Sequence, residues 1–144
     1  MQPIILQDID IYNQSLHKTQ YFRNMLENTD YVLCLVSAAE YLGLYSGTIE
    51  SEIYVVTKAD CIKHHIEFEE SNNLLYTTIN QTINDLLSDD TMDEQVILES
   101  LANEFHKNRY ADLVIAPENQ EAFQHFKPHA EEYFSYEWKS FLCL

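Results

Sequence analysis

The 144-residue chain is strongly acidic, with 24 Asp and Glu residues against 8 Lys and Arg residues and a formal net charge of −16. This balance repels phosphate backbones and anionic lipid surfaces, so it argues against direct nucleic-acid or membrane binding and favours a basic protein partner. Ten tyrosines and only two glycines exclude a disordered acidic tail and a low-complexity chain. The length suits one domain with a substantial core.

The cysteines and the N-terminal segment indicate a reducing compartment. Three widely spaced cysteines without a CxxC pair fit neither a secreted disulfide scaffold nor a zinc knuckle. Asp8 and Asp10 follow the first apolar run at once, and no basic segment precedes that run, so a signal peptide is not expected. The longest uncharged apolar run, Tyr31 to Ala39, is far shorter than the ~20 residues that cross a bilayer. We therefore expect a cytoplasmic protein.

The first expected elements are a short strand and a helix. The apolar run Pro3 to Leu6 predicts an edge strand or an extended N-terminal arm. The segment Ser15 to Asn28 predicts a helix, with Phe22, Met25 and Leu26 on its buried face.

The stretch from Asp30 to Thr57 is expected to organise the core. No charge lies between Asp30 and Glu40, which predicts a helix that is apolar on nearly every side and therefore buried. Gly43 and Gly47 offer the only positions where a positive φ is cheap, close to the expected end of that helix. The β-branched and aromatic run Ile53 to Thr57 predicts a central strand. This stretch contains no identifiable reaction chemistry.

Two further strands and a capped helix are expected next. The runs Ile66 to Phe68 and Leu74 to Tyr76 predict strands joined by a turn at Glu70 to Asn73. Thr77 or Thr78 is expected to cap a following helix, because a hydroxyl oxygen can accept a hydrogen bond from a backbone N–H of the first turn. Its apolar stripe consists of Ile79, Ile83, Leu86 and Leu87.

The C-terminal half is expected to be mainly helical. After a break at Ser88 to Thr91, Asp93 caps a helix with Glu94 in its first turn, where a carboxylate is favoured by the helix dipole. The segment Asp112 to Ile115 predicts a short strand or an apolar link. The segment Glu118 to Trp138 predicts a mostly helical run, in which Pro128 marks a break or restart. The whole chain, residues 1–144, is thus expected to form a single helix-dominated α+β domain with a small β-sheet.

Catalytic motifs are not evident. Neither glycine lies in a phosphate-binding loop, and Cys34 and Ser37 lack the context of a nucleophile and lie in core-like sequence. Glu121, His125 and His129 have the i, i+4, i+8 spacing that could place three metal ligands along a helix, but no HExxH frame is present. We therefore expect no enzyme, no metal and no other cofactor. A metal-dependent hydrolase that uses these three residues is an alternative.

One charge pattern goes beyond general acidity. Between His64 and His106 there is no Lys or Arg, whereas acidic residues recur throughout. Because the apolar stripes occupy the inward faces of both helices in this window, we expect these carboxylates to form a negative surface that steers a basic partner. The expected partner-binding residues are Asp85, Asp89, Asp90, Asp93, Glu94, Glu99 and Glu104.

Two segments carry a resemblance to a known family. The runs Ser37 to Ala39 and Leu42 to Leu44, with a short turn into Glu52 to Val55, are similar to a segment of the AbiEi-type antitoxins of type IV toxin–antitoxin systems. The runs Tyr76 to Leu87 and Asp93 to Phe105 are similar to a later segment of the same family, in the same order and at similar spacing.

Individual positions of the second segment match or depart from the family pattern. Thr82 and Asp85 match it. Asn80 and Gln81 stand where the family usually has Glu and Arg, so a local ion pair would be lost.

The resemblance, which covers roughly residues 32 to 106, implies a cytoplasmic antitoxin-like domain that acts against a nucleotidyltransferase toxin. Family members usually also carry a winged helix that binds operator DNA, but no basic recognition helix precedes the core stretch, so a repressor role is not expected. We therefore expect a non-enzymatic acidic protein that neutralises a basic nucleotidyltransferase-type partner. An acidic nucleic-acid mimic that inhibits a nuclease is an alternative, and the oligomeric state is left open.

Overall fold

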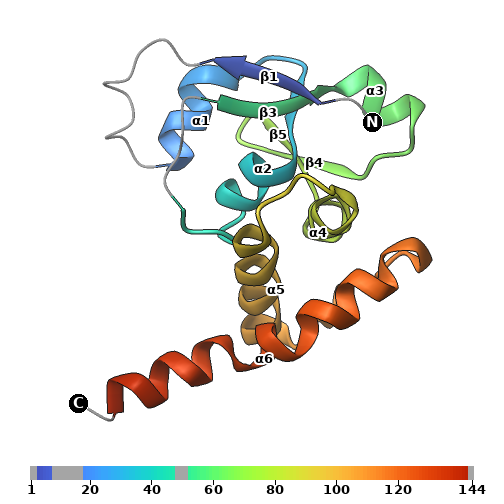
Figure 1. The fold of residues 1–144 in the computed structure, drawn as a ribbon. Helices are drawn as coiled ribbons and strands as arrows, with labels where there is room; N and C mark the ends of the chain where they lie inside the picture. The colour runs from blue at the N-terminus through green and yellow to red at the C-terminus, as the bar shows by residue number, and fades with distance from the viewer. Residues whose placement is uncertain (1–2, 8–17, 48–51, 143–144) are drawn as a thin grey trace.

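The computed structural model describes residues 3–7, 18–47 and 52–142 and shows a mixed α+β domain dominated by helices (Figure 1). This confirms the predicted fold class. The described elements are, in chain order, β1 (Ile4–Gln7), α1 (Lys18–Leu26), β2 (Tyr31–Leu33), α2 (Leu35–Tyr41), β3 (Glu52–Thr57), α3 (Lys58–Lys63), β4 (Phe68–Ser71), β5 (Leu74–Thr77), α4 (Ile79–Ser88), α5 (Glu94–Asn108), the 3₁₀ helix η2 (Pro117–Asn119) and α6 (Gln120–Leu142).

The five strands form one sheet in the order β1-β3-β2-β5-β4. The central strand β2 pairs antiparallel with β3 and parallel with β5, so that Val32 lies opposite both Val56 and Leu75. The strand at one edge is β1, which confirms the edge-strand alternative for the N-terminal run. The prediction that Ile53 to Thr57 forms a central strand is also confirmed, because β3 is bonded on both sides.

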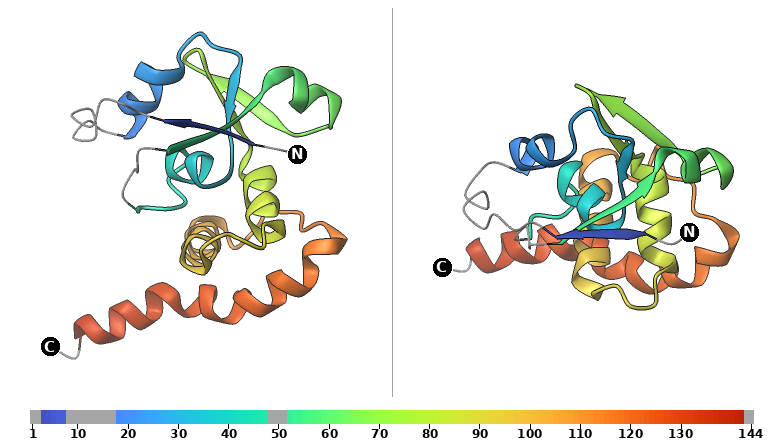
Figure 2. Two further views of the ribbon diagram at one scale, coloured as in Figure 1. Left: turned by 45° about the horizontal axis from the view of Figure 1, so that its top comes forward. Right: turned by 90° about the horizontal axis from the view of Figure 1, so that it is seen from above.

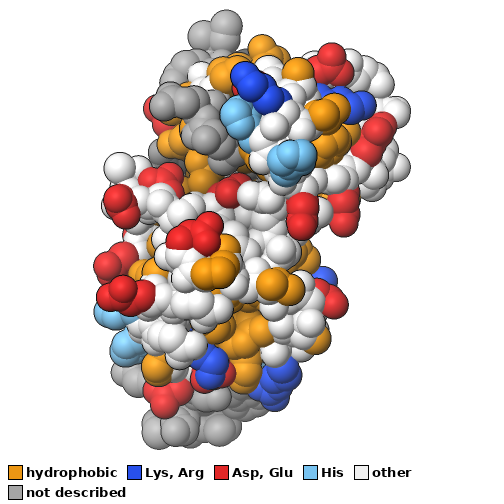
Figure 3. All heavy atoms as spheres, turned by 90° about the vertical axis from the view of Figure 1, so that its right-hand side faces the viewer, with side chains coloured by type: hydrophobic (Ala, Val, Ile, Leu, Met, Phe, Trp, Pro, Cys, Tyr) orange, Lys and Arg blue, Asp and Glu red, His pale blue; other side chains and the backbone are white. Residues whose placement is uncertain are grey.

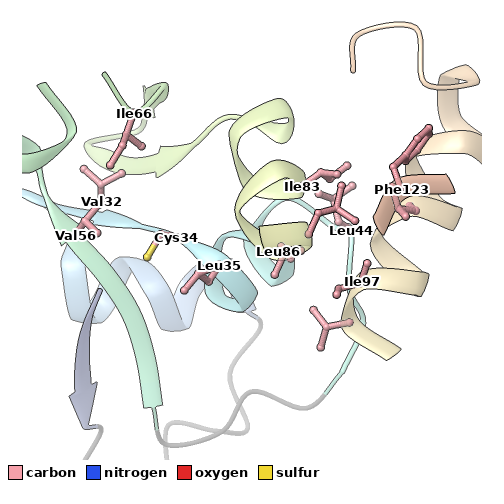
Figure 4. Close-up of a cluster of buried hydrophobic side chains, with 14 of the residues drawn as sticks. Val32, Cys34, Leu35, Leu44, Val56, Ile66, Ile83, Leu86, Ile97 and Phe123 are labelled. Carbon is pink, nitrogen blue, oxygen red and sulfur yellow. The ribbon is translucent and has the colours of Figure 1, made fainter. Parts of the chain in front are cut away.

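Both faces of the sheet are buried against helices. Side chains that alternate along a strand point to opposite faces, and here both sets are apolar. On one face Leu33, Ile53 and Val55 pack against Phe22 and Leu26 of α1. The opposite face meets α3 and α4 in a larger cluster that continues into α5 and α6, drawn in Figure 4 with Val32, Val56, Ile83, Ile97 and Phe123 among its members.

The helices after the sheet build outward from it. Helix α5 lies below the sheet and α4, and α6 lies on the far side of α5 from the sheet in both Figure 1 and the left view of Figure 2. Helix α6 is continuous through Pro128, so the predicted break at this residue is absent. The segment Asp112 to Ile115 forms a link and no strand, which decides between the two predicted alternatives.

The predicted apolar helix between Asp30 and Glu40 is only partly correct. Its first part, Tyr31–Leu33, is the central strand β2, and the helix α2 begins at Leu35. A strand buried on both faces is apolar at every position, so it has no alternating pattern to distinguish it from a buried helix. The change of structure takes place at Cys34, which has extended backbone angles, and at Leu35, which has a φ of 50°.

The two glycines serve different purposes. Gly43 has a φ of 77° just after α2, which confirms the expectation for this residue. Gly47 is not among the described residues with positive φ. A Cβ atom at Gly47 would lie 2.2 Å from the ring of Tyr45, so this glycine permits the close packing of that ring against the backbone.

The predicted caps are confirmed, whereas the predicted turn is confirmed only at Asn72 and Asn73, because Glu70 and Ser71 belong to β4 and Ile66 precedes it. Asn72 and Asn73 both have positive φ and join β4 to β5, as in a tight hairpin. Thr78, and not Thr77, caps α4 by accepting a hydrogen bond from the Gln81 N–H. Asp93 caps α5 by accepting one from the Gln95 N–H.

Thr77 is instead buried together with Thr82, and their hydroxyl oxygens lie 2.7 Å apart. We expect Thr82→Val to lower the free energy of unfolding by about 1–2 kcal/mol, because it leaves the Thr77 hydroxyl buried without its partner. The double variant Thr77→Val/Thr82→Val should be less destabilised than the single variant, since no orphaned hydroxyl remains. Urea unfolding at pH 7 measures both values. A double variant that is less stable than Thr82→Val would contradict this account.

Candidate partner-binding surface

Three segments that are distant in sequence converge on one concave site. Val36 and Glu40 come from α2, Tyr45 follows that helix, and β3 contributes Glu52 and Tyr54. The link between α4 and α5 and the first turns of α5 close the site with Asp89, Thr91, Met92, Asp93 and Val96. Together these residues line a pocket of about 290 Å³, which we call the acidic pocket.

The carboxylates from the α4–α5 link are held in place by hydrogen bonds from the backbone and from the Thr91 hydroxyl. Asp89 Oδ1 accepts from the Thr91 N–H at 2.9 Å and from the Thr91 hydroxyl at 2.7 Å. Asp93 Oδ1 accepts from the Gln95 N–H at 2.9 Å. The same bonds that shape the link therefore fix the two carboxylates at the wall of the acidic pocket.

The opposite wall joins α2 to β3. The Tyr54 N–H donates to Ser37 Oγ at 2.9 Å, which ties the strand to the helix beside the pocket. The Tyr54 hydroxyl lies 3.3 Å from Glu52 Oε2. Glu40 is only 9% exposed, whereas Glu52 is exposed. Among the described residues, the pocket thus combines four carboxylates with two tyrosine rings, and its described lining includes no Lys, Arg or His.

The sequence predicted two of these four carboxylates. Asp89 and Asp93 belong to the expected acidic surface, whereas Glu40 and Glu52 were missed. Only the pairing of β3 with β2 brings Glu52 near the α4–α5 link. The local sequence around Glu40 and Glu52 carries no signal of this proximity.

The other predicted acidic residues have different surroundings. Asp90 and Glu94 are exposed on either side of the α4–α5 link. Glu99 is half-buried and accepts hydrogen bonds from the N–H and the hydroxyl of Ser46. It therefore holds the loop after α2 against α5.

Asp85 lies partly inside the molecule, at the wall of a second pocket of about 500 Å³ that also includes Leu35 and Asp89. Its Oδ1 accepts a hydrogen bond from Gln81 Nε2 at 2.8 Å, whereas its buried Oδ2 has no hydrogen-bond partner. Burial raises the pKa of Asp85 to about 6, although the Gln81 hydrogen bond opposes the shift.

Glu104 does not lie on the surface, contrary to the prediction. Its side chain is wholly buried, and neither carboxylate oxygen has a hydrogen-bond partner. Burial raises its pKa. Ile97, Leu101 and Glu104 follow the i, i+4, i+7 spacing of one helical face, so Glu104 shares the inward face of α5. A side chain with no exposed area cannot contact a partner that docks on the outside.

The alternative metal site lacks the necessary geometry. Glu121, His125 and His129 are all exposed on α6. Within the described residues, no group of three or more His, Cys, Asp or Glu side chains could hold a metal ion. Cys34 is fully buried, as predicted, and burial raises the pKa of its thiol, which opposes formation of a nucleophilic thiolate.

The charge on the outer surface is uneven. Figure 3 shows Asp and Glu side chains scattered singly over the middle of one face, not as a continuous row. Lys and His side chains gather at the end formed by α3, where Lys58, Lys63, His64 and His65 are exposed. Exposed acidic residues accompany them, since Asp60 lies in α3 itself and Glu67 follows it.

Comparisons of the chain with protein-family models, with curated proteins and with solved structures gave no match. In the described part of the chain, no helix has the length and apolarity needed to span a membrane.

The raised pKa of Asp85 predicts a pH-dependent stability. The folded state holds the proton more tightly than the unfolded state, so the stabilisation is present at low pH and is lost as pH rises from 3.8 to about 6. Between pH 5 and pH 8 the free energy of unfolding of the wild type should fall by about 1 kcal/mol relative to that of Asp85→Asn. Urea unfolding of both proteins across this range measures the difference. Parallel curves would contradict the prediction.

Removing the buried charge of Glu104 should stabilise the fold. At pH 7.5 we expect Glu104→Gln to raise the free energy of unfolding by on the order of 1 kcal/mol, because a buried carboxylate without hydrogen-bond partners is costly when ionised. Glu132→Gln, at an exposed position of α6, is the matched control and should change little. A Glu104→Gln variant less stable than the wild type would show that Glu104 is well accommodated.

Proposed function

We propose that the chain is a non-enzymatic binding protein that engages a basic protein partner through the acidic pocket and the exposed carboxylates beside it. The observation that carries the proposal is the convergence of Glu40, Glu52, Asp89 and Asp93 on one pocket, in whose lining the described part of the chain places no Lys, Arg or His. Like charges repel one another in such a site, so a cationic group that enters it gains from all four. Asp90 and Glu94 extend the negative potential outside the pocket.

A protein is a more suitable partner for this site than a nucleic acid or a metal ion. The net charge of −16 repels phosphates. The carboxylates do not form a metal-holding group within the described residues. An acidic patch attracts a basic protein over long range and accelerates encounter in a salt-dependent way.

The proposed class of partner is a nucleotidyltransferase toxin, which is what the resemblance to AbiEi-type antitoxins suggests. One structural detail supports this proposal. Gln81, which stands where the family pattern has Arg, donates a hydrogen bond to Asp85, which matches the pattern one helical turn further on. This residue therefore still makes a polar contact along α4, although the ion pair of the family pattern is lost. A toxin that handles RNA or nucleotides would supply the basic surface.

A pull-down from the native host, at low and at high salt, tests the proposal. The tagged wild-type chain is expected to retain a nucleotidyltransferase at low salt and to release it at high salt, because exposed ion pairs are screened. Mass spectrometry identifies the captured protein. A captured nuclease that added DNA or RNA displaces would instead indicate a nucleic-acid mimic.

Charge reversal localises the surface. Asp90→Lys/Glu94→Lys should weaken binding of the captured partner by about tenfold or more, because it places positive charge at the edge of the docking site. The matched control is Glu69→Lys/Glu70→Lys, which changes the net charge equally on β4, at the opposite side of the sheet from β1 and β3. Surface plasmon resonance measures both affinities. Equal losses in the two double variants would show that net charge, and not this surface, determines binding.

A further inference from the structure

We infer that the outer edge of β1, where the backbone groups of Ile5 and Gln7 point away from the sheet, accepts an extended segment of the partner as an additional strand. We call these outward groups the free edge. The inference rests on the proposed function and specifies how the partner is held. The segment that fits the free edge alternates apolar and basic residues, as the two faces of the sheet on either side of β1 require.

The hydrogen bonds of β3 show which backbone groups of β1 point outward. The Tyr54 carbonyl oxygen accepts from the Cys34 N–H at 3.0 Å and the Tyr54 N–H donates to Ser37, so neither group points toward β1. Ile5 lies opposite Tyr54 and therefore also directs its N–H and carbonyl away from the pair, as does Gln7 two residues later. Because β1 is the last strand of the sheet, at its upper margin in Figure 1, no described strand pairs with these groups.

The two edges of the sheet differ in how they are protected. At the other edge, β4 carries the exposed charges of Glu69 and Glu70, which hinder pairing with a further strand. In contrast, β1 has no charged residue, and Ile4 and Ile5 are 39% and 47% exposed. Exposed apolar side chains beside unpaired backbone groups are typical of an edge to which another chain adds a strand.

The face of the sheet toward α1 selects apolar residues in the added strand. Ile4 and Leu6 lie opposite Val55 and Ile53, whose side chains belong to the cluster under α1. Side chains directly opposite each other in neighbouring strands share a face and contact one another. The residues of an added strand that lie beside Ile4 and Leu6 should therefore be apolar.

The other face selects basic residues. Side chains alternate between the faces, so Ile5 lies on the face opposite to that of Ile4. Just before β1, Pro3 lines the second pocket, of about 500 Å³, together with three acidic residues, Asp85, Asp89 and Asp90. A basic side chain of the added strand on this face would approach these carboxylates, so charge complementarity favours lysine or arginine at alternate positions.

A second copy of the chain is a less suitable occupant of the free edge. Two molecules that each carry a net charge of −16 repel each other, and residues 3–7 include no Lys or Arg to place beside Asp89 and Asp90. With its four residues, β1 is only about 13 Å long, so pairing along it forms few hydrogen bonds. Attraction between opposite charges is therefore needed in addition, and a basic partner supplies it.

Titration of the full-length chain with an acetylated and amidated six-residue peptide that alternates lysine and valine tests the inference. At saturation, hydrogen exchange of the Ile5 and Gln7 amides should slow by about tenfold or more, because their N–H groups gain carbonyl partners. The amides of Ile4 and Leu6 point toward β3 and should change little. Exchange measured amide by amide with ¹H–¹⁵N NMR shows whether this alternation occurs.

Two control peptides separate strand addition from attraction between charges alone. The lysine–valine peptide with every backbone nitrogen methylated keeps its charge but donates no backbone hydrogen bond, so it should bind about tenfold or more weakly. A peptide that alternates glutamate and valine should not bind. Equal binding of the methylated peptide, or of the glutamate peptide, would overturn the inference.

A matched pair of variants locates the bound peptide. Ile5→Lys places a positive charge at the free edge and should weaken binding of the lysine–valine peptide by about tenfold. Val114→Lys adds the same charge at another exposed apolar side chain, in the link before η2, and should leave the affinity unchanged. Equal losses would show that net charge, and not the free edge, determines binding. The exchange measurement uses the wild type, so it tests the inference even if Ile5→Lys disturbs β1.

The outcomes separate this inference from the proposed function. If the lysine–valine peptide leaves exchange at Ile5 and Gln7 unchanged, strand addition is wrong, while capture of a basic partner that Asp90→Lys/Glu94→Lys abolishes would still support the acidic docking surface. A dimer in sedimentation equilibrium that Ile5→Lys dissociates would show that a second copy occupies the edge, which also overturns the inference. If the peptide pairs as expected but no basic partner is captured, the proposed function fails and the free edge remains a site for strand addition.

Discussion

The central position of β2 is the constraint on which the rest of the structure depends. Val32 pairs with Val56 on one side and with Leu75 on the other, so the three-residue strand is hydrogen-bonded on both edges and buried on both faces. The chain must then leave the sheet and enter α2 within one residue. It does so through Leu35, which adopts a φ of 50° although its side chain is branched and 4% exposed. Such backbone strain persists only where the surrounding packing determines it.

This abrupt change also positions the acidic pocket. Because α2 begins directly after β2, its residues lie beside β3, and Ser37 accepts the hydrogen bond of the Tyr54 N–H. The same arrangement places Glu40 at the wall of the acidic pocket and brings it near Glu52. The acidic pocket thus depends on the direct passage of the chain from β2 into α2. Substitutions that shift α2 should therefore alter the shape of the pocket even where its lining residues are unchanged.

The fold was predictable where local chemistry decides the structure. Thr78 and Asp93 cap their helices through hydrogen bonds that their sequence positions imply, and Asn72 and Asn73 supply a tight turn. Prediction failed where burial overrides local pattern. Tyr31 to Leu33 is apolar without alternation, so strand and helix could not be distinguished, and Glu104 is an acidic residue on an inward face. Of the pocket, only the α4–α5 link could be predicted, because the other walls arise from tertiary contacts.

The acidic residues near the pocket are also structural residues, and this overlap bears on binding. Asp89 organises the link, Asp93 caps α5, and Glu99 fixes the loop that carries Tyr45. Carboxylates held by the fold lose little conformational freedom when a cation arrives, so the ordering cost of binding is reduced. A surface of solvated, flexible glutamates with the same total charge would attract a partner equally over long range. It would bind the partner less tightly, because those side chains would lose more conformational freedom on contact. Under the proposed function, the acidic pocket would therefore contribute to retention of the partner, whereas Asp90 and Glu94 would contribute mainly to the rate of encounter.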